Sequence, residues 1–317
     1  MLKALGSVSS VLIMVALGYA LAKRLWFDAA SRALLARLVV SVALPAYMVS
    51  NLMAGYDRAG LVAMLPGLPI PFAAMLANYG IALALAAAFR LSARRRGTFA
   101  ALFALSNTIF IGLPVNLLLF GPGSLPFVLL YYIANTSIFW TLGVWGIARD
   151  GARIAGAPLP PLASAGSLRR IASPPLLAFL AAVAMILAGL RLPAFVLETC
   201  RTLGSMTTPL SMLFVGTTLA ALRWKGPRLD ASLVLVLAGR FLVAPLVLFA
   251  LARGTGLELL AKEVFIMQSA MPAMTQIPIL AKSYGADEEY AALGTALTTA
   301  ASLVTIPLFM GFVARIW

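Results

Sequence analysis

Long apolar runs alternate with short polar stretches from one end of the chain to the other. As a helix, each run is long enough to cross about 30 Å of hydrocarbon. The pattern predicts an all-α polytopic membrane protein with ten transmembrane helices, five on either side of a central stretch rich in Gly, Pro and Arg. The predicted spans are 5–22, 34–52, 61–89, 98–120, 125–147, 174–190, 202–222, 231–252, 264–282 and 290–313.

The fourth span contains residues that a plain membrane helix avoids. Pro114 has no N–H to donate, so the carbonyl of Phe110 loses its partner, and Gly112 weakens the helix further. Asn107 adds a polar side chain. In hydrocarbon, broken helices are tolerated only where protein or a watery cavity covers them, and many secondary transporters build their binding sites from them. We therefore expect a broken helix here.

The same arrangement returns near the C-terminus, in residues 271–285. A shift of about 164 positions superposes this stretch on 107–121, and the same shift superposes 200–212 on 36–48. The prolines and glycines that coincide are Pro114 with Pro278, Gly121 with Gly285, and Pro45 with Pro209. The sequence thus predicts two five-helix repeats, 1–147 and 174–317, joined by a cytoplasmic linker, 148–173.

The basic residues predict how the chain is oriented in the membrane. They concentrate in alternate loops. Because Lys and Arg are in excess on the cytoplasmic side of membrane proteins, these loops should be cytoplasmic, which places both termini on the outer side of the membrane. Because each repeat has an odd number of spans, the two repeats enter the membrane in opposite senses. Broken helices 4 and 9 should then cross near mid-bilayer and present half-helix ends to a common cavity. Half-helix N-termini suit an anion such as a carboxylate.

Composition excludes several other classes of protein. The chain is 62% hydrophobic and 11% charged, too apolar for a soluble domain of 317 residues. The net charge of +14 does not indicate a nucleic-acid partner, because the basic residues lie in short loops. With no His and one Cys, we expect no metal site, no cofactor and no enzyme activity. All ten acidic residues lie in loops or at span ends, so we expect no buried carboxylate to relay protons.

The first apolar run has features of a secretory signal peptide, since Lys3 precedes it and small residues end it. We interpret it as a span instead. The repeat shift carries it onto the region of the sixth span, and its removal would leave the first repeat one helix short.

Three stretches carry a resemblance to a known family: SNTIFIGLPV in the fourth span, MPAMTQIPILAKSYGAD in the ninth, and TIPLFMG in the tenth. They resemble the auxin efflux carrier family of membrane transporters, including its bacterial malonate and malate permeases. The resemblance implies crossed broken helices, a homodimer, and elevator-like movement of a transport unit against a scaffold made of the first two spans of each half. The chain lacks the long central loop of the plant hormone carriers, which disfavours auxin itself as substrate.

We predict that polar and helix-breaking residues inside the spans bind the substrate. Asn107 would donate to a carboxylate, and Arg240 is the one charge deep inside a span, with an anion or a cluster of carbonyls as its expected partner. Each of these polar residues could instead hydrogen-bond neighbouring helices. The predicted set is Asn107, Gly112, Pro114, Thr275, Gln276, Pro278, Arg240, Asn135, Ser50 and Asn51.

The predicted function is secondary transport of a small organic anion by elevator-type alternating access. An anion channel would need charged rings or a carbonyl filter, which the sequence does not show. A sodium-coupled symporter of a bile-acid-like anion is a further alternative, although uniport or weak coupling is preferred because no buried carboxylate is expected.

Overall fold

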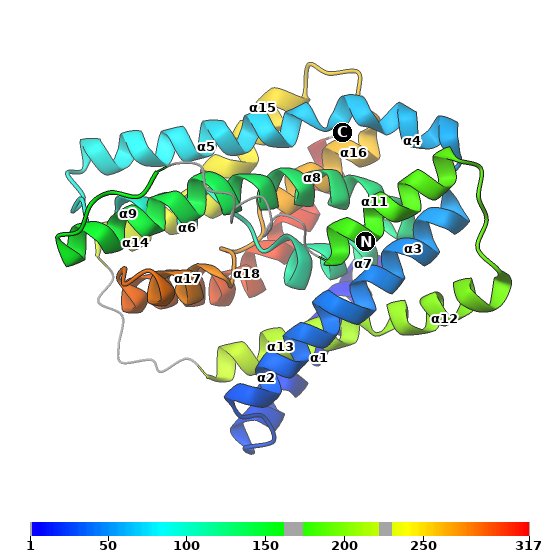
Figure 1. The fold of residues 1–317 in the computed structure, drawn as a ribbon, viewed down its shortest axis with the longest axis horizontal. Coiled ribbons are helices and arrows are strands. Elements are labelled where there is room, and N and C mark those ends of the chain that lie inside the picture. The colour runs from blue at the N-terminus through cyan, green and yellow to red at the C-terminus, as the bar shows by residue number, and fades with distance from the viewer. Residues whose placement is uncertain (1, 162–173, 222–229, 317) are drawn as a thin grey trace. The chain divides into compact units, whose positions relative to one another are not determined.

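The computed structural model describes residues 2–161, 174–221 and 230–316, and every regular element in these ranges is a helix (Figure 1). Five helical stretches are long and apolar enough to cross a membrane by themselves. They are Ala29–Gly55, Arg58–Ala88, Pro122–Ala155, Ala231–Ala252 and Glu288–Phe309. This confirms the polytopic all-α class, while the count of ten spans and the inverted repeat remain predictions.

The chain divides into two compact units, and each unit draws on both halves of the sequence. The first unit comprises Met1–Gly67, Ile109–Leu129 and Ala172–Leu222, and the second comprises Leu68–Thr108, Leu130–Ile171 and Arg223–Trp317. Spatial grouping therefore follows different boundaries from the predicted sequence repeats.

In the first unit, α1 packs along α13, and α3 packs against both α11 and α12. Small residues allow the first contact: a side chain added at Gly18 or Gly216 would collide with backbone atoms of the facing helix. Close backbone approach of this kind is a common means of helix association in membranes. The unit's elements are α1 (Leu2–Lys23), α2 (Ala29–Leu38), η1 (Val39–Ala43), α3 (Leu44–Gly55), α4 (Arg58–Met64), η2 (Leu65–Gly67), α7 (Leu113–Phe120), η4 (Pro122–Ser124), α11 (Pro174–Leu187), α12 (Ala194–Ser205) and α13 (Thr207–Ala220).

In the second unit, α6 lies at the centre, in contact with α5, α9, α14, α17 and α18. Eight of the nine residues of this helix, all except Arg96, are buried, as expected for a helix surrounded by others. The unit's elements are α5 (Pro69–Ala88), α6 (Arg96–Ala104), most of α8 (Leu125–Ile138), η5 (Phe139–Gly143), α9 (Val144–Ala155), α14 (Ala231–Ala238), η6 (Gly239–Val243), α15 (Ala244–Ala252), α16 (Leu259–Ser269), α17 (Ile277–Ser283) and α18 (Glu288–Ile316). The turn η3 (Thr108–Gly112) continues the chain into α7.

Three prolines inside apolar runs do not break their helices. Pro45, Pro114 and Pro245 each stand at the second position of an α-helix that follows directly on a π-helical turn. A proline ring clashes with the carbonyl four residues earlier, and a widened turn before it gives that carbonyl a different partner. The predicted break at Pro114 is therefore wrong in position, because the chain absorbs this proline by local widening.

The predicted linker begins with a helix. Helix α9 continues to Ala155, so the first eight residues of 148–173 are helical, and Asp150 within them is fully buried. The expectation that no carboxylate is buried is thus wrong. Residues 162–173 of the linker lie outside the described part of the chain.

Candidate functional site

Two interruptions of the helices in the second unit lie against each other. Helix α6 ends at Ala104 and the next helical turn starts at Thr108, while α16 ends at Ser269 and α17 starts at Ile277. Between these ends the chain is not helical, and Ser106 and Ala273 form an antiparallel bridge. We refer to Leu105–Thr108 and Met271–Gln276 as the paired segments.

Backbone hydrogen bonds hold the paired segments together on both sides of the bridge. The N–H of Asn107 donates to the carbonyl of Pro272 over 2.8 Å, and the N–H of Met274 donates to the carbonyl of Leu105 over 3.2 Å. Backbone groups released by the helix breaks thus find partners in each other, as a low-dielectric environment requires. The two stretches that the sequence predicts to be broken are broken, and they meet.

The outer edge of each paired segment is held by a polar side chain from another helix. Asn135 of α8 accepts the N–H of Ser106 over 3.0 Å and donates to its carbonyl over 2.9 Å. On the other segment, the N–H of Ala273 donates to the hydroxyl of Thr298 in α18 over 3.1 Å. Both side chains are fully buried. Each segment therefore has its neighbour on one edge and a side-chain clamp on the other.

Arg240 lies at the point where the two interrupted helices end. Its guanidinium donates to the carbonyl of Phe103 near the end of α6 (3.1 Å), to that of Ser269 at the end of α16, and to that of Met271 (2.9 and 3.1 Å). The side chain is 0% exposed. Gly239 permits the approach, since a side chain there would strike the ring of Phe103.

The opposite end of α6 carries a negative partner. The carboxylate of Asp150 accepts the backbone N–H groups of Gly97 (3.1 Å) and Thr98 (2.7 Å) and the hydroxyl of Thr98 (2.9 Å). Gly97 and Gly146 allow α6 and α9 to touch backbone to backbone. An acidic cap at the N-terminus and a basic cap at the C-terminus both match the helix dipole.

The structure places the first-half candidates at different points of one continuous stretch. Asn107 is buried in the paired segment. Gly112 ends the π-helical turn, and its carbonyl accepts the amide of Asn116 over 2.7 Å. Pro114 is buried at the start of α7. Only Asn107 of these three lies in the paired segments.

The other candidates separate into two groups. Thr275 and Gln276 are half-buried at the end of the second paired segment, and Pro278 begins the helix after it. Ser50 and Asn51 belong to the first unit, where both side chains donate to the carbonyl of Tyr47 in their own helix. Those two bonds are the ordinary way a polar residue is satisfied within a membrane helix.

Sequence reasoning missed several residues of this site. Ser106, Thr298 and the carbonyl of Phe103 were not among the candidates, and Asp150 was assigned to the linker. Thr298 is one of several Thr residues in the last span, and the sequence carries no signal that separates it from its neighbours. Gln268 is fully buried, donates to the carbonyl of Thr108 over 3.4 Å, and its side-chain oxygen has no partner within the described residues.

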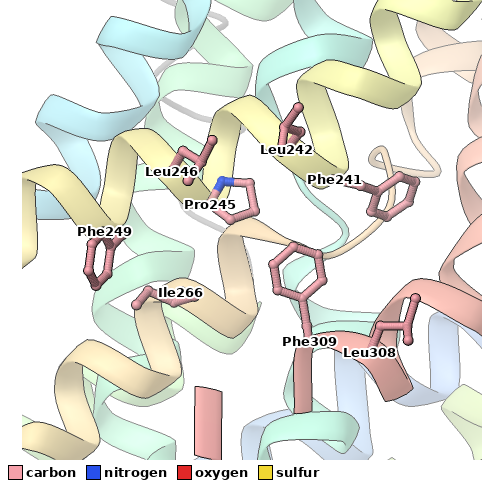
Figure 2. Close-up of a pocket in the computed structure, with 8 residues that line it drawn as sticks. All are labelled: Phe241, Leu242, Pro245, Leu246, Phe249, Ile266, Leu308 and Phe309. Carbon is pink, nitrogen blue, oxygen red and sulfur yellow. The ribbon is translucent and has the colours of Figure 1, made fainter. Parts of the chain in front are cut away.

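A pocket of about 230 Å³ elsewhere in the second unit is entirely apolar (Figure 2). Figure 2 shows aromatic and aliphatic side chains from η6, α15, α16 and α18 around it. Its lining side chains offer no polar group to orient a charged ligand. The lining residues are Phe241, Leu242, Pro245, Leu246, Phe249, Ile266, Leu308 and Phe309.

Comparison with known proteins agrees with a membrane transporter. Residues 3–310 match the family described as membrane transport protein. An uncharacterized transporter of Methanothermobacter thermautotrophicus is 29% identical over 316 residues, covering 96% of each chain. An uncharacterized transporter of Methanocaldococcus jannaschii is 26% identical over 224 residues, covering 70% of each chain.

Proposed function

This chain belongs to the membrane transport protein (auxin efflux carrier) family, and from that premise we propose that it is a secondary transporter of a small organic anion, a mono- or dicarboxylate. Family and relatives are transporters, which are not enzymes. The anion, the mechanism and the bacterial inner membrane are our proposals.

The charge distribution of the second unit supports an anion. Among the described residues, Arg240 and Asp150 are the buried charged side chains. Arg240 lies at the paired segments, whereas Asp150 is held at the far end of α6 by amide groups. The buried polar side chains at or next to the paired segments, including Asn107 and Gln268, are neutral. No carboxylate of the described residues lies at the paired segments, and Arg240 already covers the carbonyls of the two helix ends, so neither kind of group is left there to bind a cationic ligand, which favours an anion.

The division into two units supports movement of one body against another. The first unit contains the first two predicted spans of each half, and the second contains most of the third and fifth and the eighth, ninth and tenth. The fourth span is divided, because residues 109–120, with Gly112 and Pro114, belong to the first unit. Apart from this span, the division follows the scaffold and transport unit that we propose for elevator-type alternating access. We further propose a homodimer, with chemical cross-linking in the membrane as its test.

Uptake by purified protein in liposomes tests this function. The assay compares labelled monocarboxylates and dicarboxylates with amino acids, sugars and organic cations. We expect uptake of at least one carboxylate, and Asn107→Ala should lower its rate at least about tenfold, because a lost hydrogen bond to a charged group weakens binding by that order. Asn78→Ala is the matched control, since this asparagine is also buried in the second unit and is not among the predicted binding residues. Transport of cations alone, or full uptake by Asn107→Ala, would contradict the proposal.

A further inference from the structure

Two helices of the second unit direct their negative ends at the same place. Carbonyls at the C-terminal ends of α6 and α16, from Phe103 and Ser269, both accept from one guanidinium. A helix C-terminus carries about half an elementary negative charge. Together, the two ends amount to about one negative charge inside the protein.

Arg240 balances this charge by itself. Its guanidinium donates to three carbonyls, and in the described part of the chain it forms no ion pair with a carboxylate. One positive charge therefore meets about one negative charge from the helix ends. A second cation at this position would be unbalanced and buried, which is strongly unfavourable.

Carbonyls at unwound segments and half-helix C-termini are also the groups that coordinate Na⁺ in ion-coupled transporters. Here the guanidinium covers them. We propose that Arg240 is a built-in cation that takes the place of a coupling Na⁺, so that transport needs no sodium gradient. This inference rests on the proposed function for its transport consequence, but the site itself can be tested without any substrate. Arg240 is then a positioning residue, which holds the two helix ends together.

The first experiment measures thermal unfolding of the purified protein in NaCl, KCl and choline chloride at equal ionic strength. We expect the Tm of the wild-type protein to be the same in all three salts. Arg240→Ala should lower the Tm in choline chloride by on the order of 5–10 °C, because it exposes an uncompensated pair of buried helix ends. Added NaCl should then raise the Tm of this variant along a saturable curve, since Na⁺ can bind the freed carbonyls.

Two further variants keep the test decisive. Arg240→Lys retains the positive charge, so its Tm should not depend on Na⁺ even if that Tm is below the wild-type value. If Arg240→Ala does not fold, the salt dependence of the Tm is measured on Arg240→Lys instead. Arg201→Ala is the surface control: this arginine is exposed and paired with Glu198, and its removal should leave both Tm and salt response unchanged. A Na⁺-dependent Tm in the wild-type protein, or a stable Arg240→Ala variant indifferent to Na⁺, would overturn the inference.

The second experiment compares carboxylate uptake with and without an inward sodium gradient. We expect equal initial rates for the wild-type protein, and at least about twofold acceleration by sodium would show a coupling site that Arg240 does not occupy. Absence of any carboxylate uptake would instead refute the proposed function. The stability measurements would still decide whether Arg240 replaces a cation.

Discussion

Replacement of Asn135 by Ala tests whether the paired segments are held from outside. The amide of Asn135 makes two hydrogen bonds to the backbone of Ser106, at 3.0 and 2.9 Å, and the side chain is 0% exposed. Alanine would leave a buried N–H and a buried carbonyl without partners. Each such group costs about 1–3 kcal/mol, so the variant should lose about 2–6 kcal/mol of stability. For a protein of this size we expect the Tm to fall by roughly 5–15 °C.

The measurement is thermal unfolding in detergent together with carboxylate uptake in liposomes. Asn78→Ala is the matched control, because Asn78 is a buried asparagine of the same unit whose side-chain oxygen has no hydrogen-bond partner among the described residues. Asn78→Ala should shift the Tm much less. If Asn135→Ala kept both the wild-type Tm and wild-type uptake, Asn135 would not be the clamp we describe. Reduced uptake with an unchanged Tm would point to substrate contact instead.

Two more predictions concern Thr298, which bonds the second paired segment, and Asp150, which caps the opposite end of α6. Thr298→Val removes the acceptor of the Ala273 N–H with little change in volume, so it should lower the free energy of unfolding by about 1–3 kcal/mol and lower the Tm with it. Thr299→Val is the control and should have little effect, because the hydroxyl of Thr299 donates to Thr295 in its own helix. Equal Tm values for the two variants would contradict the role of Thr298. Asp150→Asn should lower the Tm more than Asp57→Asn. Asp150 is a buried helix cap that accepts three hydrogen bonds, whereas Asp57 is an exposed helix cap. A larger Tm decrease for Asp57→Asn would refute this reasoning.

The sequence was sufficient to predict an interruption in each of the stretches 106–121 and 271–285, but not the one at Met206, between α12 and α13. The predicted eighth span, 231–252, coincides with the helix from Ala231 to Ala252. These features are local: apolar length, Gly, Pro and an intramembrane Asn determine them. The position of the break is not local. Pro114 predicted it within α7, but it lies at Leu105–Asn107, where the backbone bonds to the second paired segment and to the side chain of Asn135.

The partners of the buried polar residues depend on topology, which the sequence does not reveal. Arg240 was expected to meet either an anion or a cluster of carbonyls, and the structure provides the carbonyls of two helices far apart in the chain. Asp150 resembles a linker residue because it follows the fifth apolar run. It is buried because α9 continues and packs on α6 through Gly97 and Gly146. Such contacts between distant segments cannot be predicted from one segment of the sequence at a time.

The opposite charges at the two ends of α6 have a consequence for the response to membrane voltage. A charge that crosses a membrane does electrical work of about 2.3 kcal/mol per 100 mV. Arg240 and Asp150 are both buried in the same compact unit and cancel, so this pair adds no net charge to any displacement of that unit. Taken by itself, this pair would therefore add nothing to the current that accompanies a transport cycle.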